Sequence, residues 1–211
     1  MRTLGFLRAA ALGLAGLTLV ACTDSMLGTP TRAKVTVAGR PVVIAAPAGF
    51  CIDSPSTQVT TGGAFVLISD CALLGLSKAE KAPVGAALTA SVSSGGLGGE
   101  GDDEAATLDD LQAFIDTPDG RALMGRSGRA GRVRVLSKIQ KDDVLYVLVE
   151  DRGQQPIAGI DNRFWRAFLE VNGRMTVLSV VGFEGTGPGA QEALNDLAAL
   201  ATAIQQANAG A

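Results

Sequence analysis

Histidine is absent from the 211-residue sequence, and aromatic residues make up only 4% of it. Without histidine the chain can form no Ser-His-Asp or Cys-His catalytic group, no histidine zinc site and no histidine pH switch. Charged residues are also few, at 18%, while an apolar fraction of 47% is too high for a disordered chain. We therefore expect one folded domain plus a further segment, with no cofactor.

The first residues have the pattern of a targeting signal. Arg2 and Arg8 supply positive charge, and residues 9–21 are an apolar or small run of 13 residues. A bilayer-spanning helix needs roughly 20 residues, so this run is too short to be one. Its length and its flanking charge are those of a signal-peptide core.

The targeting run ends in Leu19-Val20-Ala21-Cys22, which resembles the lipobox of bacterial lipoproteins. The resemblance implies cleavage between Ala21 and Cys22, with a lipid attached to the Cys22 thiol at the new N-terminus. The alternative is an ordinary secretory signal that happens to contain a cysteine. In this family an Asp after the lipidated cysteine favours retention in the inner membrane. Thr23 occupies that position here, so the resemblance favours the outer membrane, on its periplasmic side.

These patterns divide the chain into three parts. Residues 1–21 form the signal peptide, residues 22–33 a lipidated N-terminus and polar tether, and residues 34–208 a single domain. Cleavage leaves 16 basic and 21 acidic residues, a net charge of −5, which argues against nucleic acid as a partner. Attachment to the membrane of the bacterial envelope would then depend on the acyl chains at Cys22.

Two cysteines remain once Cys22 is acylated. Cys51 and Cys71 lie in strand-like stretches, and the compartment outside the inner membrane is oxidising, so we expect a disulfide between them. Such a bridge stabilises a fold by roughly 3 kcal/mol. A redox pair and two buried free thiols are the alternatives, although the C-x-x-C spacing of redox pairs is missing.

The first half of the domain alternates strand-like and turn-like segments. Strands are predicted at residues 34–37, 41–46, 50–53, 64–70 and 88–93, with a hairpin turn at Ala38-Gly39. Residues 54–63 are expected to form a turn-rich loop, and residues 93–101 a flexible segment.

A helix is predicted after Thr107, which serves as its N-cap with Asp110 three residues later. Residues 118–120 are expected to interrupt this helix, and residues 121–125 to add one further turn. The apolar stripe of the helix contains Leu108, Leu111, Phe114 and Ile115.

The second half is predicted to contain two hairpins and a closing helix. The first hairpin joins residues 132–139 to 144–150, and the second joins 164–171 to 174–183 across Asn172-Gly173. Residues 190–208 form the helix, whose covering stripe contains Leu194, Leu197, Ala201 and Ile204.

Both faces of the second hairpin are apolar, so layers are expected above and below it. Arg166 and Ser179 should face each other across it, while Trp165 and Tyr146 are expected in the core. One face carries Trp165, Leu169, Val171, Leu178 and Val180, and the other carries Phe164, Phe168, Met175, Val177 and Val181.

Together these elements predict an α+β fold. Its sheet is mainly antiparallel, with a mid-chain helix and a C-terminal helix packed on it. The order of the elements resembles that of PsbP/Mog1-like α/β/α sandwiches. That fold serves accessory and binding proteins without a shared chemistry, so the resemblance does not indicate one function.

Charge is strongly segregated along the middle of the chain. Residues 100–119 contain eight acids and no base, and residues 120–141 contain seven bases and no acid. One interpretation, which is not the one that the pattern favours, is a patch for an anionic lipid or an envelope protein, formed by Arg126, Arg129, Arg132 and Arg134. The interpretation that the pattern favours is that the acids stabilise a helix N-terminus and the arginines form a solvated face, with some pairs between them, because charge runs usually form solvated faces.

The sequence favours a non-enzymatic, lipid-anchored envelope protein with a binding or assembly role. The alternative is a carboxylate- or metal-dependent envelope enzyme that uses the acidic cluster between Glu100 and Asp110. No catalytic motif supports the second reading, and the acidic cluster does not follow the EF-hand pattern.

Overall fold

The computed structural model describes residues 30–75, 85–98, 106–126, 128–155 and 157–210. Strands come first in the chain, followed by two short helices, four more strands and a long C-terminal helix. In chain order the elements are β1 (Arg32–Val37), β2 (Arg40–Ala45), β3 (Phe50–Val59), β4 (Gly63–Asp70), β5 (Ala86–Ser93), α1 (Leu108–Ile115), α2 (Pro118–Met124), the 3-10 turn η1 (Ala130–Arg132), β6 (Val133–Lys141), β7 (Val144–Asp151), β8 (Arg163–Val171), β9 (Arg174–Gly182) and α3 (Ala190–Asn208).

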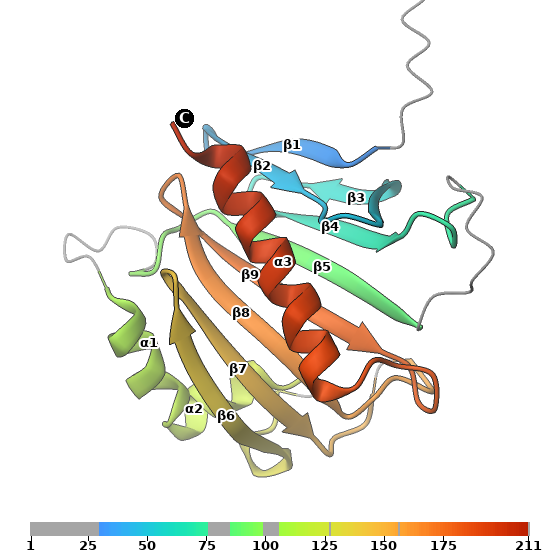
Figure 1. Cartoon of the computed structure of the whole chain (residues 1–211). Helices are drawn as coiled ribbons and strands as arrows, with labels where there is room; N and C mark the ends of the chain where they lie inside the picture. Colours follow the sequence, from blue (N-terminus) through green and yellow to red (C-terminus); the bar gives the residue numbers. More distant parts are fainter. Residues whose placement is uncertain (1–29, 76–84, 99–105, 127, 156, 211) are drawn as a thin grey trace, which may run out of the picture.

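Seven strands form one sheet in the order β3-β4-β5-β9-β8-β7-β6, and every pairing in it is antiparallel. β1 and β2 form a separate two-stranded sheet beside it (Figure 1). The central β5–β9 pair joins the first half of the chain to the second. The predicted α+β class, with a mainly antiparallel sheet and a C-terminal helix, is therefore confirmed.

The sheet is covered on both faces. α3 crosses one face, and α1 and α2 lie behind the strands at the other (Figure 1). The first core cluster includes Trp165 and Leu178 together with the buried side of α3, and the second includes Phe164 and Phe168 together with Ile115 of α1. The sequence prediction that both faces of the β8–β9 hairpin are covered is thus confirmed.

The hairpin turns use residues that accept positive φ angles. Asn172 has φ 51° and Gly173 φ 69°, the combination that a two-residue turn between twisted strands requires. Arg166 faces Ser179 in the resulting register, as predicted. Trp165 and Tyr146 are buried in the core, and the Trp165 indole N–H donates to the Ala190 carbonyl at 2.8 Å.

The start of α1 follows the sequence prediction. The Thr107 hydroxyl accepts from the Asp110 N–H at 3.2 Å, and the Asp110 carboxylate accepts from the Thr107 N–H at 2.8 Å. Along the predicted apolar stripe Ile115 is fully buried, but Phe114 is 40% exposed, so its expected burial is wrong. The reason is that α1 has only eight residues and its Ile115 side contacts the sheet.

Residues 118–120 were expected to interrupt the helix before one further turn at residues 121–125, and the structure differs. They form the first turn of α2, with Pro118 at a position where a helix needs no N–H and with Thr117 as the N-cap. Gly120 packs so closely on α1 that a Cβ there would lie 2.0 Å from the Phe114 carbonyl oxygen.

Residues 54–63 were expected to form a loop; this expectation is wrong for residues 54–59, and only residues 60–62 turn between the two strands. β3 continues to Val59, with a register shift between Asp53 and Gln58 opposite β4. The Ser56 hydroxyl donates to the Asp53 carboxylate at 2.6 Å within this irregular stretch. β3 is an edge strand, where Pro55 and a bulge are tolerated because one side of the strand needs no ladder partner.

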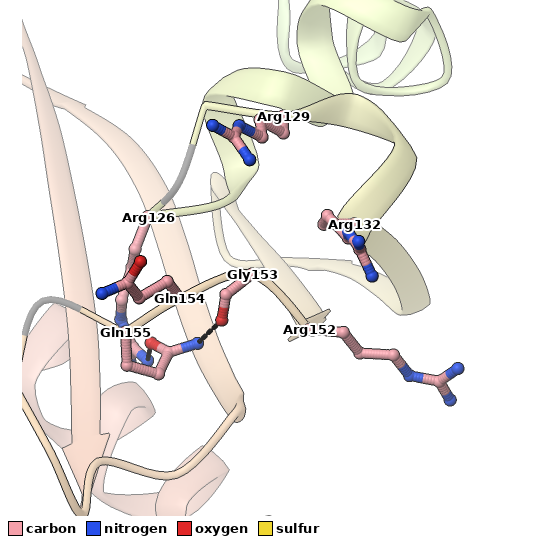
Figure 2. Close-up of a pocket in the computed structure, with 7 residues that line it drawn as sticks. All are labelled: Arg126, Arg129, Arg132, Arg152, Gly153, Gln154 and Gln155. Atoms are coloured by element: carbon pink, nitrogen blue, oxygen red, sulfur yellow. Dashed lines mark hydrogen bonds between the residues drawn. The ribbon is translucent and has the colours of Figure 1, made fainter.

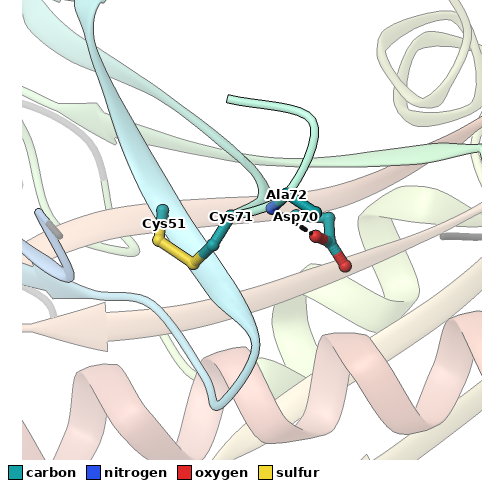
Figure 3. Close-up of a disulfide and its surroundings, with 4 residues drawn as sticks. All are labelled: Cys51, Asp70, Cys71 and Ala72. Atoms are coloured by element: carbon teal, nitrogen blue, oxygen red, sulfur yellow. Dashed lines mark hydrogen bonds between the residues drawn. A yellow bond between two sulfur atoms is a disulfide. The ribbon is translucent and has the colours of Figure 1, made fainter. Parts of the chain in front are cut away.

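A disulfide joins Cys51 in β3 to Cys71 directly after β4, as predicted, with 4.9 Å between the two Cα atoms (Figure 3). Cys51 is fully buried. The residues that flank Cys71 are also joined, since the Ala72 N–H donates to the Asp70 carboxylate at 2.7 Å. The bridge therefore fixes the end of the β3–β4 pair at the outer edge of the sheet.

Candidate functional site

A surface cavity of about 560 Å³ lies where three segments of the chain meet. Its walls come from the residues after α2, from η1 and from the segment that follows β7 (Figure 2). We call this cavity the arginine pocket; its lining consists of Arg126, Arg129, Arg132, Arg152, Gly153, Gln154 and Gln155.

The walls of the arginine pocket are joined through Asp151, the last residue of β7, which is fully buried. Its carboxylate accepts from the Arg126 N–H and from the Gly153 N–H, each at 2.7 Å. The Gln155 amide donates to the Asp151 carbonyl at 3.0 Å. One buried carboxylate therefore sets the distance between two walls of the pocket.

Gly125 is required for this close approach. A Cβ at Gly125 would lie 2.3 Å from Cγ2 of Val133 and 3.0 Å from Oδ2 of Asp151. No side chain fits at such distances unless the neighbouring atoms move. Glycine at this position allows the segment after α2 to lie against the start of β6.

Arg126 is held in a defined orientation. Its Nη1 donates to Oε1 of Gln155 at 2.8 Å and to the Asp161 carbonyl at 2.9 Å. The guanidinium carbon lies 3.9 Å from the centre of the Phe164 ring, a cation–π contact. Burial lowers the pKa of Arg126, while Asp151 and Asp161 oppose that change.

A second guanidinium lies behind the first. Arg166 is half-buried; its Nη1 donates to the Leu123 carbonyl at 3.1 Å, and its guanidinium carbon lies 5.4 Å from the centre of the same Phe164 ring. Its Nε is buried and has no hydrogen-bond partner among the described residues. Burial, reinforced by the charge of Arg126, lowers the pKa of Arg166 to about 10, with Asp151 opposing. Arg166 therefore remains protonated at neutral pH.

Three further arginines share a single acidic partner. Glu150, whose side chain is only 4% exposed, pairs with Arg152 at 2.8 Å, Arg163 at 3.0 Å and Arg134 at 3.7 Å. The hydrogen bond from Arg163 holds the pKa of Glu150 below its ordinary value, burial opposes this, and the charges of Arg152, Arg163 and Arg134 add to it. One carboxylate cannot neutralise three guanidinium groups, so this region keeps excess positive charge.

Arg129 and Arg132 differ from these arginines, because neither pairs with a carboxylate among the described residues. Their hydrogen bonds within the described part of the chain join backbone groups: the Arg132 N–H donates to the Arg129 carbonyl, and the Arg152 N–H donates to the Arg132 carbonyl, each at 2.9 Å. The described residues of the pocket and of the contacts given above carry seven arginines and three acids, a formal excess of four positive charges: Arg126, Arg129, Arg132, Arg134, Arg152, Arg163 and Arg166 against Glu150, Asp151 and Asp161.

The predicted basic patch is thus brought together only in part. Arg126, Arg129 and Arg132 line one cavity, whereas Arg134 lies outside it and pairs with Glu150. The remaining lining residues were missed because Arg152 to Gln155 form no motif. Nothing in their sequence indicated that this segment lies opposite η1.

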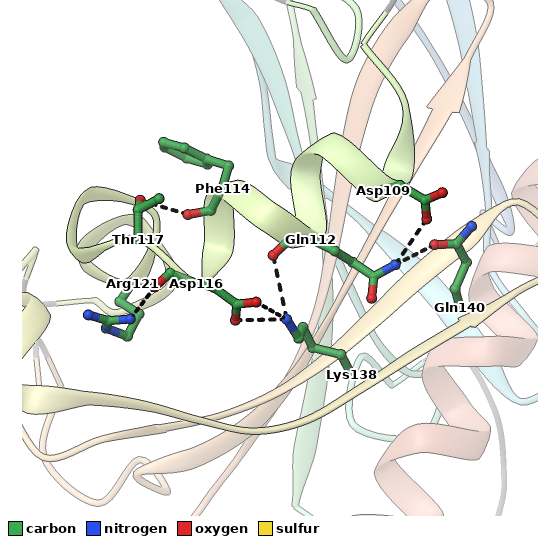
Figure 4. Close-up of polar contacts among 8 residues, drawn as sticks. All are labelled: Asp109, Gln112, Phe114, Asp116, Thr117, Arg121, Lys138 and Gln140. Atoms are coloured by element: carbon green, nitrogen blue, oxygen red, sulfur yellow. Dashed lines mark hydrogen bonds and ion pairs between the residues drawn. The ribbon is translucent and has the colours of Figure 1, made fainter.

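Part of the charged block is paired, as the alternative interpretation of the sequence expected. The Lys138 ammonium donates to both carboxylate oxygens of Asp116 at 2.7 Å, which ties β6 to the end of α1 (Figure 4). Nearby, the Gln112 amide donates to the Gln140 side chain at 2.7 Å, and Arg121 donates to the Asp116 carbonyl.

The acidic cluster is only partly described. Glu100, Asp102, Asp103 and Glu104 lie outside the described residues, as do Ala21 and Cys22. Asp110 is used in the cap of α1, where the Thr107 hydroxyl and N–H lower its pKa. Within the described part of the chain, no group of three or more acidic or cysteine side chains is placed to hold a metal ion.

Comparison with protein-family models, with curated proteins and with solved structures finds no match to this chain. The resemblances to lipoproteins and to PsbP/Mog1-like sandwiches therefore stay predictions from the sequence. In the part of the chain that the structure describes, no helix is both long and apolar enough to cross a bilayer. Fold and pocket together define an α+β protein with a cationic surface cavity.

Proposed function

We propose that this chain is a lipid-anchored protein of the bacterial envelope with a non-enzymatic binding or assembly role. Its anchor is the lipid on Cys22, it faces the periplasm, and it resides in the outer membrane. The Leu19-Val20-Ala21-Cys22 run and the residue that follows it support the anchor and its location. The Cys51–Cys71 disulfide fits an oxidising compartment.

The arginine pocket is the surface through which the protein binds its partner, an anionic component of the envelope. One observation carries this proposal: Arg129 and Arg132 line a cavity without a carboxylate partner among the described residues. Charges that serve only solubility are normally scattered and mixed in sign. Here Arg126, Arg129 and Arg132 line one concave surface, and ligands usually bind in concave sites.

Native mass spectrometry of the protein extracted from its own membranes tests the anchor. The proposal expects an acyl mass on Cys22, and a mass two hydrogens short that reduction restores. An unmodified Cys22 would contradict the anchor and leave a secreted domain.

Photocrosslinking tests the binding role. A photoreactive residue at Arg129 or Arg132 should capture one dominant envelope component in intact cells. The matched control is the same residue at Arg40, at the far end of the sheet beside the β8–β9 turn, where Nη1 donates to the Asn172 carbonyl. Equal capture from Arg40 would contradict a binding role for the arginine pocket.

A further inference from the structure

The interior of the arginine pocket offers hydrogen-bond donors and no described acidic side chain. Its lining consists of arginine, glutamine and glycine. The carboxylate of Asp151 is buried in the wall and already accepts from two backbone N–H groups. An anion that enters therefore meets guanidinium groups, and the carboxylate behind them is occupied.

The guanidinium groups stand on different walls. Arg129 and Arg132 lie on the η1 side, and Arg126 on the segment that follows α2 (Figure 2). Arg126 uses Nη1 for Gln155 and Asp161, which leaves the Nε and Nη2 groups of its guanidinium without a partner among the described residues. Arg152 contributes less, because its Nη2 lies 2.8 Å from Glu150. Three guanidinium groups are thus available to one ligand.

This arrangement distinguishes between kinds of anion. A planar carboxylate is satisfied by a single guanidinium fork. A phosphate group carries more charge and presents acceptor oxygens in several directions, so it can bind guanidinium groups from several walls at once. The cavity, at about 560 Å³, is larger than a phosphate ion and leaves room for the group to which the phosphate is attached.

We infer that the arginine pocket binds the phosphate group of a phosphorylated small molecule or lipid headgroup. Arg129 and Arg132 contact the phosphate directly, and Arg126, fixed against Phe164 and Gln155, supplies the third guanidinium. The inference rests on the proposed binding role of the pocket. It replaces an unspecified anionic partner with one ligand chemistry.

Calorimetric titration of the full-length chain in a neutral detergent tests this inference, with inorganic phosphate and glycerol 3-phosphate as probes. We expect saturable binding at about 1 mM or tighter, which weakens as salt rises because the site is open to solvent. Arg129→Gln and Arg132→Gln should each weaken it about tenfold. Arg40→Gln removes the same charge at the far end of the sheet and should leave binding unchanged. Melting curves show that each variant is folded.

Two further arms separate the sources of the phosphate and exclude other anions. Nanodiscs containing phosphatidylglycerol that displace glycerol 3-phosphate identify a lipid headgroup, and nanodiscs that do not displace it identify a soluble phosphate compound. Both results support the site. Equally tight binding of a glutamate-rich peptide would overturn the inference in favour of an acidic protein partner. So would the absence of phosphate binding, or an equal loss in Arg40→Gln.

The two proposals fail separately. If phosphate does not bind but Cys22 carries an acyl chain and Arg129 captures a partner, the phosphate inference is wrong and the proposed function stands. If phosphate binds as expected but Cys22 is unmodified, the phosphate site stands and the lipid anchor is wrong.

Discussion

Replacing Asn208 with alanine is expected to lower the free energy of unfolding by about 2–3 kcal/mol. Asn208 ends α3 and is only 8% exposed. Its Oδ1 accepts from the Val43 N–H at 2.9 Å, and its Nδ2 donates to the Val43 carbonyl at 2.8 Å. The side chain thus takes the place of a neighbouring strand along β2 and fixes the end of α3 to it.

The magnitude follows from the groups that lose their partner. Removal of the amide leaves both polar backbone groups of Val43 without a hydrogen bond at a half-buried position, at a cost of about 1 kcal/mol each. The Asn172 amide, which donates to Asn208 at 3.2 Å, adds a smaller amount. For a domain of this size the expected fall in Tm is about 4–12 °C.

Urea and thermal unfolding of the variant measure this effect. Asn195→Ala is the matched control, since Asn195 is exposed on the same helix and its side chain accepts only from Gln191, at 3.1 Å. Asn195→Ala should lower the free energy of unfolding by no more than about 0.5 kcal/mol. Equal losses from the two variants would refute the reasoning. Faster hydrogen exchange at the Val43 amide in Asn208→Ala alone would support it.

Three other changes test the disulfide, the charge cluster and the close packing. Replacing both Cys51 and Cys71 with alanine should lower the free energy of unfolding in urea by about 3 kcal/mol, because the bridge closes a loop across a sequence separation of 20 residues. A decrease of less than about 1 kcal/mol would contradict this. The hydrogen bond from Arg163 lowers the pKa of Glu150 in the folded state. The ionised Glu150 carboxylate therefore contributes its full stabilisation above about pH 5, and this stabilisation is lost as the pH falls through the lowered pKa. The stability difference between wild type and Glu150→Gln should therefore shrink on acidification from about pH 6 to pH 3, and a constant difference would be evidence against it. Gly125→Ala should destabilise the fold by about 1–3 kcal/mol in thermal unfolding, since there is no room for a Cβ, and an unchanged Tm would show that the neighbouring groups move aside at no cost.

Local sequence signals predicted most elements because their causes are local. Asn172-Gly173 predicted a hairpin through its tolerance of positive φ, and the alternation beyond it predicted which side chains share a face. Thr107 and Asp110 predicted the start of α1 through reciprocal hydrogen bonds three residues apart. Where the prediction failed, a neighbour decided the outcome: Pro55 fits within β3 only because that strand lies at the edge of the sheet.

By itself, the sequence determined the α+β class, the register of the β8–β9 hairpin, the C-terminal helix and the disulfide pair. Each of these depends on residue periodicity, on turn chemistry or on the count of cysteines. Only the tertiary structure decided the strand order, because the pairing of β5 with β9 joins segments about 90 residues apart, and no local signal encodes such a pairing. The arginine pocket has the same origin: Asp151 brings the segment after β7 against the segment after α2, and the arginines converge only once that contact exists.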